Sequence, residues 1–469
     1  MTELNLLGSP SIKKIHFIGI GGISMSGLAE ILLNFGYEVS GSDIRSSSIT
    51  KKLEKLGVKV FIGHSESNIQ SPDLVVYTAA INQSNPELIK AHRLGIPAID
   101  RAELLGQIMR KYKHSIAVAG THGKTTTTSM ISTTALKCNL DPTIHIGGEL
   151  DAIGGTTRVG GNNCFIAEAC EYCGSFLKFY PYIAVVLNIE YDHADYFKDI
   201  SHIKDTFAKF ISQVPENGYV VACADDSNIL QILDGVYCNK VTFGLDPEKA
   251  MWSAANIVFD DRGCASFNLL FNKKDMGVIK MNVPGIHNVS NAVAAAATCH
   301  ILGCNIDSIR LALSDFWGTH RRFELKGTSN DIKVIDDYAH HPTEIKATLK
   351  AAKNFRHSKV WCVFQPHTYS RTKSLLSDFS DSFNDADEII ITDIYAAREV
   401  DTGEISAKDL ALRIRSSGKK VVYIKKFEDI VSYLEDKASP GDIIITMGAG
   451  DVYRIGEMFL ENKKVMAVS

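Results

Sequence analysis

A short apolar strand that ends in a glycine-rich turn and runs directly into a helix constrains this chain more than any other feature. The strand is predicted over residues 115–119, and the helix begins in the threonine-rich segment at Lys124. Backbone N–H groups at a helix start bind phosphate, lysine neutralises its charge, and threonine can bind magnesium. The turn is not a standard Walker A loop, because Val118 stands where that pattern requires glycine. An ordinary glycine turn would not need a Lys-Thr pair, so we predict a phosphate site built from Gly120, Thr121, His122, Gly123, Lys124, Thr125 and Thr126.

A second glycine-rich turn, GIGGIS, follows the first apolar segment and begins at Gly19. Asp43 ends the next predicted strand, 24 residues after Gly19, about where a dinucleotide-binding fold places the acid that contacts ribose. Ser24 replaces the third glycine of that fingerprint. The turn therefore favours a phosphate-bearing nucleotide of some kind and leaves a nicotinamide cofactor open as an alternative.

Short apolar runs alternate with helix-like stretches along the whole chain, which is typical of α/β folds with mostly parallel sheets. A length of 469 residues is too great for one hydrophobic core and suggests about three domains. A new unit opens with the strand at Ser115, and a further set of strands begins after Trp317. We predict domains over residues 1–110, 111–317 and 318–469.

Composition narrows the class of partner. The chain has no apolar run of the 18 or more residues that a membrane span needs, and its N-terminus lacks the pattern of a secretory signal. A net charge of -4 argues against sequence-independent nucleic-acid binding. The ten cysteines are scattered and favour reduced thiols over a disulfide framework. We expect a cytoplasmic protein with neither a membrane nor a nucleic-acid partner.

Several further motifs accompany the two turns. They are HFIGIGGISMSGLA, SGSD, AGTHGKTTTT, NIEYDHADYF, GIHNVSNAVAAAA, GTHRRFEL, DDYAHHPTEI, QPHTYSRT and MGAGD. In this order and spacing they resemble the Mur ligase family over essentially the whole chain. The resemblance implies an N-terminal Rossmann-like domain that binds a UDP substrate, a central P-loop ATPase domain, and a C-terminal Rossmann-like domain that receives an amino acid.

The motifs are most similar to those of family members that join L-alanine to the lactyl carboxylate of UDP-N-acetylmuramate during peptidoglycan precursor synthesis. The resemblance implies an acyl-phosphate intermediate, with ATP as the energy source and Mg²⁺ as the metal. We expect a monomer or homodimer. The UDP-substrate contacts implied are Gly19, Gly21, Gly22, Ser42 and Asp43.

The resemblance also implies a metal site and a nucleotide pocket. His193 and Glu171, together with Thr125, resemble the magnesium ligands, and a hard cation lowers the repulsion between two reacting anions. Glu168 stays open as an alternative to Glu171. The adenine and ribose contacts implied are His287, Asn288 and Asn291, although asparagines could equally cap a helix.

Arg322 resembles an arginine that reaches the terminal phosphate from across a domain boundary, and its charged fork suits a phosphoryl group in transfer. Its neighbour Arg321 is either a second candidate or a surface charge. Asp337 and His340 resemble contacts to the nucleotide or acyl phosphate, and His341 is a weaker candidate. His367 and Arg371 resemble the amino-acid pocket, where the arginine would pair with the substrate carboxylate. The catalytic set implied is Lys124, His193, Arg322, Asp337 and His340.

Two departures from the family pattern bear on these expectations. Cys170 and Cys173 replace two acids beside the expected metal, which also opens a redox or zinc alternative for a C-x-x-C pair. The sequence holds no second such pair to complete a four-coordinate zinc site. Thr368 stands where some relatives carry a second arginine, so we expect the pocket to hold alanine with one arginine fewer.

Three other functions stay open. A recycling ligase that attaches a preformed peptide to the same sugar nucleotide would share the first two domains. A nicotinamide-dependent dehydrogenase would leave GTHGKTT unexplained. A silent nucleotide-binding regulator would not need Lys124, His193 and Arg322 together.

Overall fold

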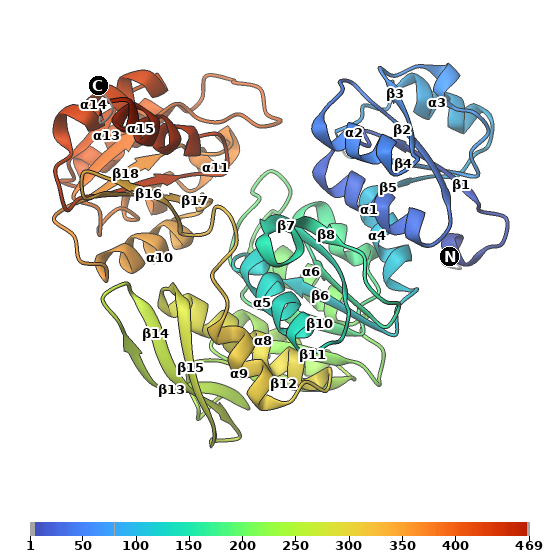
Figure 1. Cartoon of the computed structure of the whole chain (residues 1–469), viewed down its shortest axis with the longest axis horizontal. Coiled ribbons are helices and arrows are strands. Elements are labelled where there is room, and N and C mark those ends of the chain that lie inside the picture. The colour runs from blue at the N-terminus through green and yellow to red at the C-terminus, as the bar shows by residue number, and fades with distance from the viewer. Residues whose placement is uncertain (1–4, 79, 467–469) are drawn as a thin grey trace.

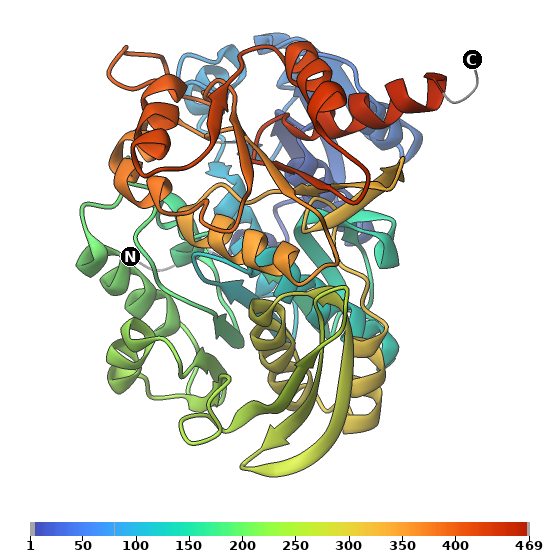
Figure 2. The same cartoon turned by 90° about the vertical axis from the view of Figure 1, so that its left-hand side faces the viewer.

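The computed structural model describes residues 5–78 and 80–466, which form three α/β units, each built on one sheet (Figure 1). The N-terminal and C-terminal units lie on the same side of the central one in this view. Turned by 90°, the C-terminal unit stands in front of the N-terminal one (Figure 2). The predicted α/β class with mostly parallel sheets is confirmed.

The N-terminal sheet is fully parallel, in the order β3-β2-β1-β4-β5. Its strands are β1 (Lys14–Ile18), β2 (Glu38–Asp43), β3 (Lys59–Ile62), β4 (Leu74–Tyr77) and β5 (Ala98–Asp100). Its helices are α1 (Ile23–Asn34), α2 (Ser48–Lys55), α3 (Pro86–Arg93) and α4 (Arg101–Met109). The strand order reverses at β1, so a ligand is expected beyond the carboxyl end of this strand. The turn at Gly19 lies at that end.

The central sheet has ten strands in the order β15-β14-β13-β12-β11-β10-β6-β9-β7-β8. Its strands are β6 (His114–Ala119), β7 (Thr143–Leu150), β8 (Gly155–Arg158), β9 (Cys164–Glu168), β10 (Ile183–Val186), β11 (Tyr219–Cys223), β12 (Asn239–Phe243), β13 (Trp252–Phe259), β14 (Cys264–Phe271) and β15 (Lys274–Pro284). Its helices are α5 (Lys124–Lys137), α6 (Ile200–Ile211), α7 (Ser227–Ile232), α8 (Ile286–Ile301) and α9 (Ile306–Ser314). Strands β13, β14 and β15 pair antiparallel with one another, as do β7 and β8, and the strands from β13 to β7 run parallel.

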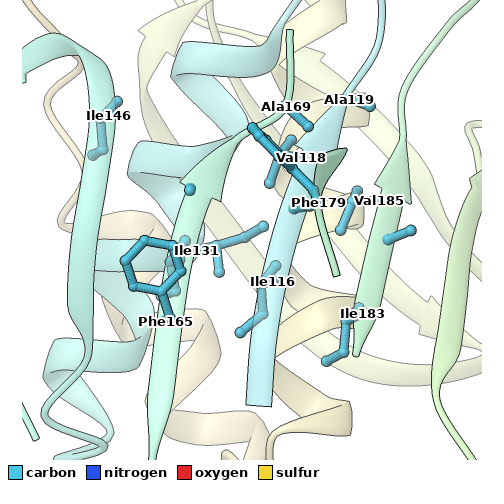
Figure 3. Close-up of a cluster of buried hydrophobic side chains, with 14 of the residues drawn as sticks. Ile116, Val118, Ala119, Ile131, Ile146, Phe165, Ala169, Phe179, Ile183 and Val185 are labelled. Carbon is cyan, nitrogen blue, oxygen red and sulfur yellow. The ribbon is translucent and has the colours of Figure 1, made fainter. Parts of the chain in front are cut away.

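The central strands are buried and read as continuous apolar runs, which is typical of a sheet covered by helices. Ile116, Val118, Phe165, Ile183 and Val185 pack together in this core (Figure 3). Helices α5 and α8 pack side by side on the sheet. Both begin at the nucleotide pocket described below, so the core fixes the positions of its walls.

The C-terminal sheet has the order β16-β17-β21-β18-β19-β20, and β16 alone is antiparallel to its neighbour. Its strands are β16 (Glu324–Ser329), β17 (Ile332–Asp337), β18 (Val360–Phe364), β19 (Glu388–Ile391), β20 (Val421–Tyr423) and β21 (Ile443–Met447). Its helices are α10 (Pro342–Lys353), α11 (Tyr369–Ser374), α12 (Leu376–Ser380), α13 (Ala407–Ser416), α14 (Phe427–Lys437) and α15 (Tyr453–Met466).

The three sheets are joined by short connections. Helix α4 ends at Met109 and β6 begins at His114, while α9 ends at Ser314 and β16 begins at Glu324. We keep 1–110, 111–317 and 318–469 as the proposed domain limits. Short 3-10 helical segments cover Leu6–Gly8, Glu66–Asn68, Asp151–Ile153, Tyr172–Lys178 and Leu233–Gly235. Within the described residues, none of the helices combines the length and apolar character needed to cross a membrane.

Candidate active site

The glycine-rich turn after β6 can take only glycine at two positions. Gly120 and Gly123 have φ values of 146° and 80°, which side-chain-bearing residues rarely adopt. A Cβ atom on Gly120 would lie 2.9 Å from Leu187 Cβ, and one on Gly123 would lie 2.9 Å from Asn291 Oδ1. The turn is therefore pressed against the loop after β10 and against α8, with α5 starting at Lys124.

Lys124 points back over the turn toward an acid. Its Nζ donates to the carbonyl of Thr121 at 3.0 Å and to the Glu171 carboxylate at 3.0 and 3.1 Å. Burial alone would lower the pKa of Lys124, but the nearby Glu171 carboxylate outweighs it and raises the pKa. Lys124 is thus a retained cation at the start of the helix, where phosphate binding is expected.

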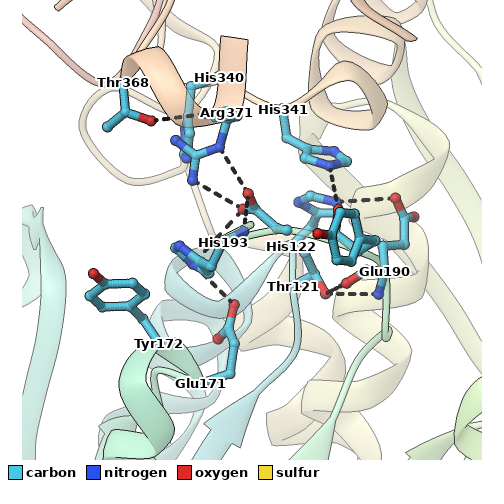
Figure 4. A network of polar contacts seen from close by, with 12 residues as sticks. Thr121, His122, Glu171, Tyr172, Glu190, His193, His340, His341, Thr368 and Arg371 are labelled. Carbon is cyan, nitrogen blue, oxygen red and sulfur yellow. Dashed lines mark hydrogen bonds and ion pairs between the residues drawn. The ribbon is translucent and has the colours of Figure 1, made fainter. Parts of the chain in front are cut away.

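The expected metal ligands lie beside this lysine. Glu171 is buried, and its Oε1 lies 3.7 Å from His193 Nε2 (Figure 4). Glu168 instead accepts hydrogen bonds from Thr125 Oγ1 at 3.2 Å and from the Gly147 N–H at 2.8 Å. Burial lowers the pKa of His193, which favours the neutral imidazole that a metal needs. Carboxylate and hydroxyl oxygens with one imidazole fit a magnesium ion, so both acids remain candidates.

Three of the predicted nucleotide contacts come together at the start of α8. His287, Asn288 and Asn291 line a cavity of about 200 Å³ with Thr126. Asn291 Nδ2 donates to Asn288 Oδ1 at 3.1 Å, and Asn288 Nδ2 donates to the Pro284 carbonyl at 2.7 Å. These bonds fix the amides at the cavity wall, where they can meet a purine edge.

The structure separates the two neighbouring arginines. Arg321 donates to Asp336 Oδ2 at 2.9 Å and to the Gly448 carbonyl at 2.8 Å, so it holds the C-terminal unit together. Arg322 reaches the central unit, where its Nη2 donates to Thr125 Oγ1 at 3.2 Å. Arg322 also lines the nucleotide cavity, so of the two arginines it remains the candidate for a terminal phosphate.

Asp337 and His340 line cavities at the same junction. Burial raises the pKa of Asp337 to about 6, although Arg322 and two backbone N–H groups oppose this. Burial lowers the pKa of His340 to about 3. Its Nδ1 lies 2.9 Å from the Tyr338 carbonyl and must donate to it, which leaves Nε2 as an acceptor. His341 caps α10 and contacts the Tyr191 carbonyl of the central unit at 3.2 Å.

His122 is held by two acids that sequence reasoning did not single out. Its ring nitrogens lie 3.2 Å from Glu344 and 3.4 Å from Glu190, as Figure 4 shows for Glu190. Burial alone would lower the pKa of His122, but these carboxylates raise it to about 9.

His122, Glu190 and His341 also form a group close enough to hold a metal ion. Thr343 Oγ1 donates to Glu190 at 2.6 Å, so this acid already has two partners. Glu344 sits in DDYAHHPTEI, the one motif that could have revealed it.

The predicted amino-acid pocket forms a separate cavity of about 190 Å³. It is lined by His193, His340, His367 and Arg371 among others. Arg371 is buried and donates from Nε and Nη2 to the two oxygens of Asp192 at 2.8 and 3.2 Å. Its Nη1 lies 3.1 Å from His367 Nδ1. The structure thus gives this arginine a protein carboxylate as partner, a contact that the sequence did not predict.

A third cavity, of about 730 Å³, joins the other two. It shares Gly123, Arg322 and Glu344 with the nucleotide cavity, and His193 and His340 with the amino-acid cavity. Lys124, Thr125 and Glu168 line it, as does Ile23 of the N-terminal unit. A phosphate donor, an acid and an amine could therefore meet where these three cavities adjoin.

The predicted UDP-substrate residues surround the end of β1. Asp43 Oδ2 accepts the Gly21 N–H at 2.8 Å and so holds the turn after Gly19 and before Gly22. Ser42 is fully buried, and its hydroxyl donates to Glu87 at 2.6 Å. Ser42 Oγ also lies 3.0 Å from His64 Nδ1. The structure brings all five residues to one edge but commits the Ser42 hydroxyl to an internal network.

Cys170 and Cys173 are free thiols, the first partly buried and the second exposed. Cys170 lines the central cavity near Lys124. Burial raises the pKa of Cys170 to about 11, so it is a thiol near neutral pH. The single metal-compatible group among the described residues contains neither cysteine.

Comparison with known proteins places this geometry in a family. Three family models match in order: "Mur ligase family, catalytic domain" over residues 14–113, "Mur ligase middle domain" over residues 118–299, and "Mur ligase, glutamate ligase domain" over residues 321–450. Together they cover most of the chain.

Similar curated proteins carry one description. UDP-N-acetylmuramate–L-alanine ligase from Acetivibrio thermocellus is 64% identical over the full length of both chains. The protein of that description from Caldanaerobacter subterraneus is 55% identical over 96% of this chain and 98% of its own.

Solved structures agree with these matches. UDP-N-acetylmuramate-alanine ligase from Thermotoga maritima superposes with a TM-score of 0.79 at 30% identity, covering 97% of this chain and 99% of its own. A murein peptide ligase from Psychrobacter arcticus gives a TM-score of 0.69 at 26% identity, covering 96% and 98%. Full-length identity, the three matched regions and the shared three-domain fold together establish that the chain belongs to the Mur ligase family.

Proposed function

We propose that this protein ligates L-alanine to the lactyl carboxylate of UDP-N-acetylmuramate, using ATP and Mg²⁺ and releasing ADP and phosphate. The single observation that carries the proposal is the run of three adjoining cavities. One is lined by predicted nucleotide contacts, one by the phosphate loop, and one by the predicted amino-acid residues. We also propose that it works in the cytoplasm as a monomer or homodimer.

The reaction needs a leaving group, because a carboxylate is a poor electrophile. A lactyl oxygen attacks the terminal phosphorus of ATP, the bond to ADP breaks, and an acyl phosphate forms. The alanine nitrogen then attacks the acyl carbon, and the C–O bond to phosphate breaks as the amine loses a proton. Protein groups contribute chiefly by positioning and charge stabilisation in such transfers.

Lys124 and Arg322 are the cations that we assign to the transferring phosphate. They meet at the start of α5, because Arg322 donates to Thr125, the residue that follows Lys124. Thr125, His193 and Glu171, or Glu168 in its place, would hold magnesium, which lowers repulsion between the two anions. A phosphate that draws Lys124 from Glu171 would leave that carboxylate available to a cation.

Two histidines at the proposed amine site are uncharged near neutral pH. Burial lowers the pKa of His340 to about 3 and that of His367 to about 4. Both rings are therefore neutral near pH 7 and add no positive charge there. His367 Nδ1 already accepts from Arg371 Nη1, so its Nε2 carries the proton and donates. The Nε2 atom of His340 is the acceptor left by its bond to Tyr338.

The size of the amine cavity favours an amino acid over a peptide. A volume of about 190 Å³ suits a small amino acid, whereas a tripeptide donor would have to extend out of it. The choice of amine donor in the assay below separates the proposal from a recycling ligase.

The test is phosphate release from ATP with UDP-N-acetylmuramate, comparing L-alanine with a tripeptide as the amine donor. We expect release that depends on L-alanine. Release with the tripeptide alone would favour the recycling reaction. Tight binding of the sugar nucleotide without amine-dependent release would favour a silent regulator, and reduction of a nicotinamide without ATP turnover would favour a dehydrogenase.

A further inference from the structure

The predicted amino-acid cavity is lined by a second arginine, Arg398, that the sequence motifs did not indicate. Thr368 occupies the position where a second arginine was considered, and Arg371 is bonded to both oxygens of Asp192. A substrate carboxylate in this cavity would have to compete with a buried protein carboxylate for Arg371. Another cation at the wall would remove that competition.

Arg398 is that cation. It lies in the connection between β19 and α13, far from the QPHTYSRT motif in sequence, and it lines the cavity together with Thr368 and Ser370. Its side chain is 51% exposed, whereas that of Arg371 is 6% exposed. Arg398 can therefore receive a ligand from solution, which a fully enclosed arginine cannot do without rearrangement.

Two groups of the central unit hold Arg398 at the wall. Its Nη2 donates to Asp195 Oδ2 at 3.0 Å, and its guanidinium lies 4.3 Å from the centre of the Tyr172 ring. The Tyr172 hydroxyl donates to the same Asp195 oxygen at 2.8 Å. Tyr172 also lies beside the His193 ring, with 4.8 Å between centroids (Figure 4). A stacked, singly bonded guanidinium keeps further N–H groups for a bidentate carboxylate.

We infer that Arg398, and not Arg371, binds the carboxylate of the amino-acid substrate, with Asp195 and Tyr172 as its positioning residues. The inference rests on the proposed ligation of L-alanine. From Thr368 we expect a pocket with one arginine fewer. The inference instead supplies a second arginine, Arg398, from a different loop. The alternative is that Arg398 only ties the C-terminal unit to Asp195.

The experiment measures steady-state phosphate release for the full chain, with L-alanine, ATP and UDP-N-acetylmuramate varied in turn. Arg398→Ala is expected to raise the KM for L-alanine by roughly tenfold or more, the scale of one lost charge-assisted hydrogen bond. The KM values for the other two substrates should move less than about twofold. Arg398→Lys should recover part of the loss, because it keeps the charge but not the fork.

Two further variants separate carboxylate binding from tethering. Asp195→Asn removes the ion pair but keeps the arginine, so it should raise the KM for L-alanine less than Arg398→Ala does. Arg413→Ala, a change of an exposed arginine on α13, should leave all three KM values unchanged. Circular dichroism is the check that each variant is folded.

The outcomes are distinct. Equal effects of Arg398→Ala and Asp195→Asn, equal losses for all three substrates, or an unchanged KM for L-alanine would each overturn the inference and leave the ligation itself intact. Absence of L-alanine-dependent release in the wild-type protein would instead overturn the proposed function.

Discussion

Arg371 of the C-terminal unit and Asp192 of the central unit form a buried ion pair with two hydrogen bonds, at 2.8 and 3.2 Å. Burial alone would raise the pKa of Asp192, but Arg371 outweighs it and holds the pKa well below its usual range. Asp192 immediately precedes His193, a proposed metal ligand. The pair therefore connects the position of the C-terminal unit to the backbone that carries this histidine.

Arg371→Ala is the first prediction. From the sequence, its loss would weaken the binding of alanine far more than that of the other two substrates, but the structure predicts a wider effect because the change leaves Asp192 buried and unpaired. Breaking such a pair costs about 3–5 kcal/mol, so we expect lower thermal stability and reduced kcat/KM for all three substrates. Thermal denaturation and steady-state kinetics provide the measurement. A loss confined to L-alanine would return the carboxylate contact to Arg371.

Lys124→Ala should lower turnover by about a hundredfold or more, because it removes a charge from the transferring phosphate. Lys137→Ala provides a matched control at the other end of α5, where the lysine is exposed and pairs with Asp315. We expect near-normal phosphate release from the control. Normal release from a folded Lys124→Ala protein would contradict the ATP-site assignment.

Glu171→Gln should raise the magnesium concentration needed for half-maximal activity more than Glu168→Gln does. Glu171 faces His193 and Lys124, whereas Glu168 is already held by Thr125 and the Gly147 N–H. Magnesium titrations of phosphate release at saturating substrates decide the ranking. The reverse order would assign the metal to Glu168.

Protonation of the buried His145 is expected to lower the free energy of unfolding in acid. Its Nε2 lies 2.8 Å from Ser24 Oγ of the N-terminal unit, and burial, aided by Arg101, lowers its pKa to about 3 from 6.5. The unfolded chain binds a proton here below about pH 6.5, whereas the folded chain does not until about pH 3, so stability falls as the pH falls through this window. Above it, His145 is neutral in both states and contributes no pH dependence.

The measurement compares the wild-type protein with His145→Gln, which keeps a hydrogen-bonding group. Between pH 7.5 and pH 5, the thermal midpoint of the wild-type protein should drop further than that of the variant. Parallel decreases in the two proteins would show that His145 does not carry this dependence.

The parts of the site that the sequence predicted are those built from contiguous residues. The geometry of the turn around Lys124 follows from its local sequence, because the strand, the glycines and the start of the helix are consecutive in the chain. Arg322 could not be ranked firmly above Arg321, because only the packing of two units decides which reaches Thr125. Arg398 and Glu87 belong to no recognisable motif. Their contacts, with Asp195 and with Ser42, are made to residues far away in the chain. The Asp192 contact shows the same limit, because a motif identifies an arginine but not its partner.

The acids that hold Arg371 and Arg398 belong to the central unit, while both arginines belong to the C-terminal one. A chimaera that exchanged the C-terminal unit between relatives would therefore part each arginine from its acid unless the loop spanning Asp192 and Asp195 were exchanged with it. The residues that we propose to select the amine therefore lie on both sides of the boundary between these two units, and the residues on the two sides must change together.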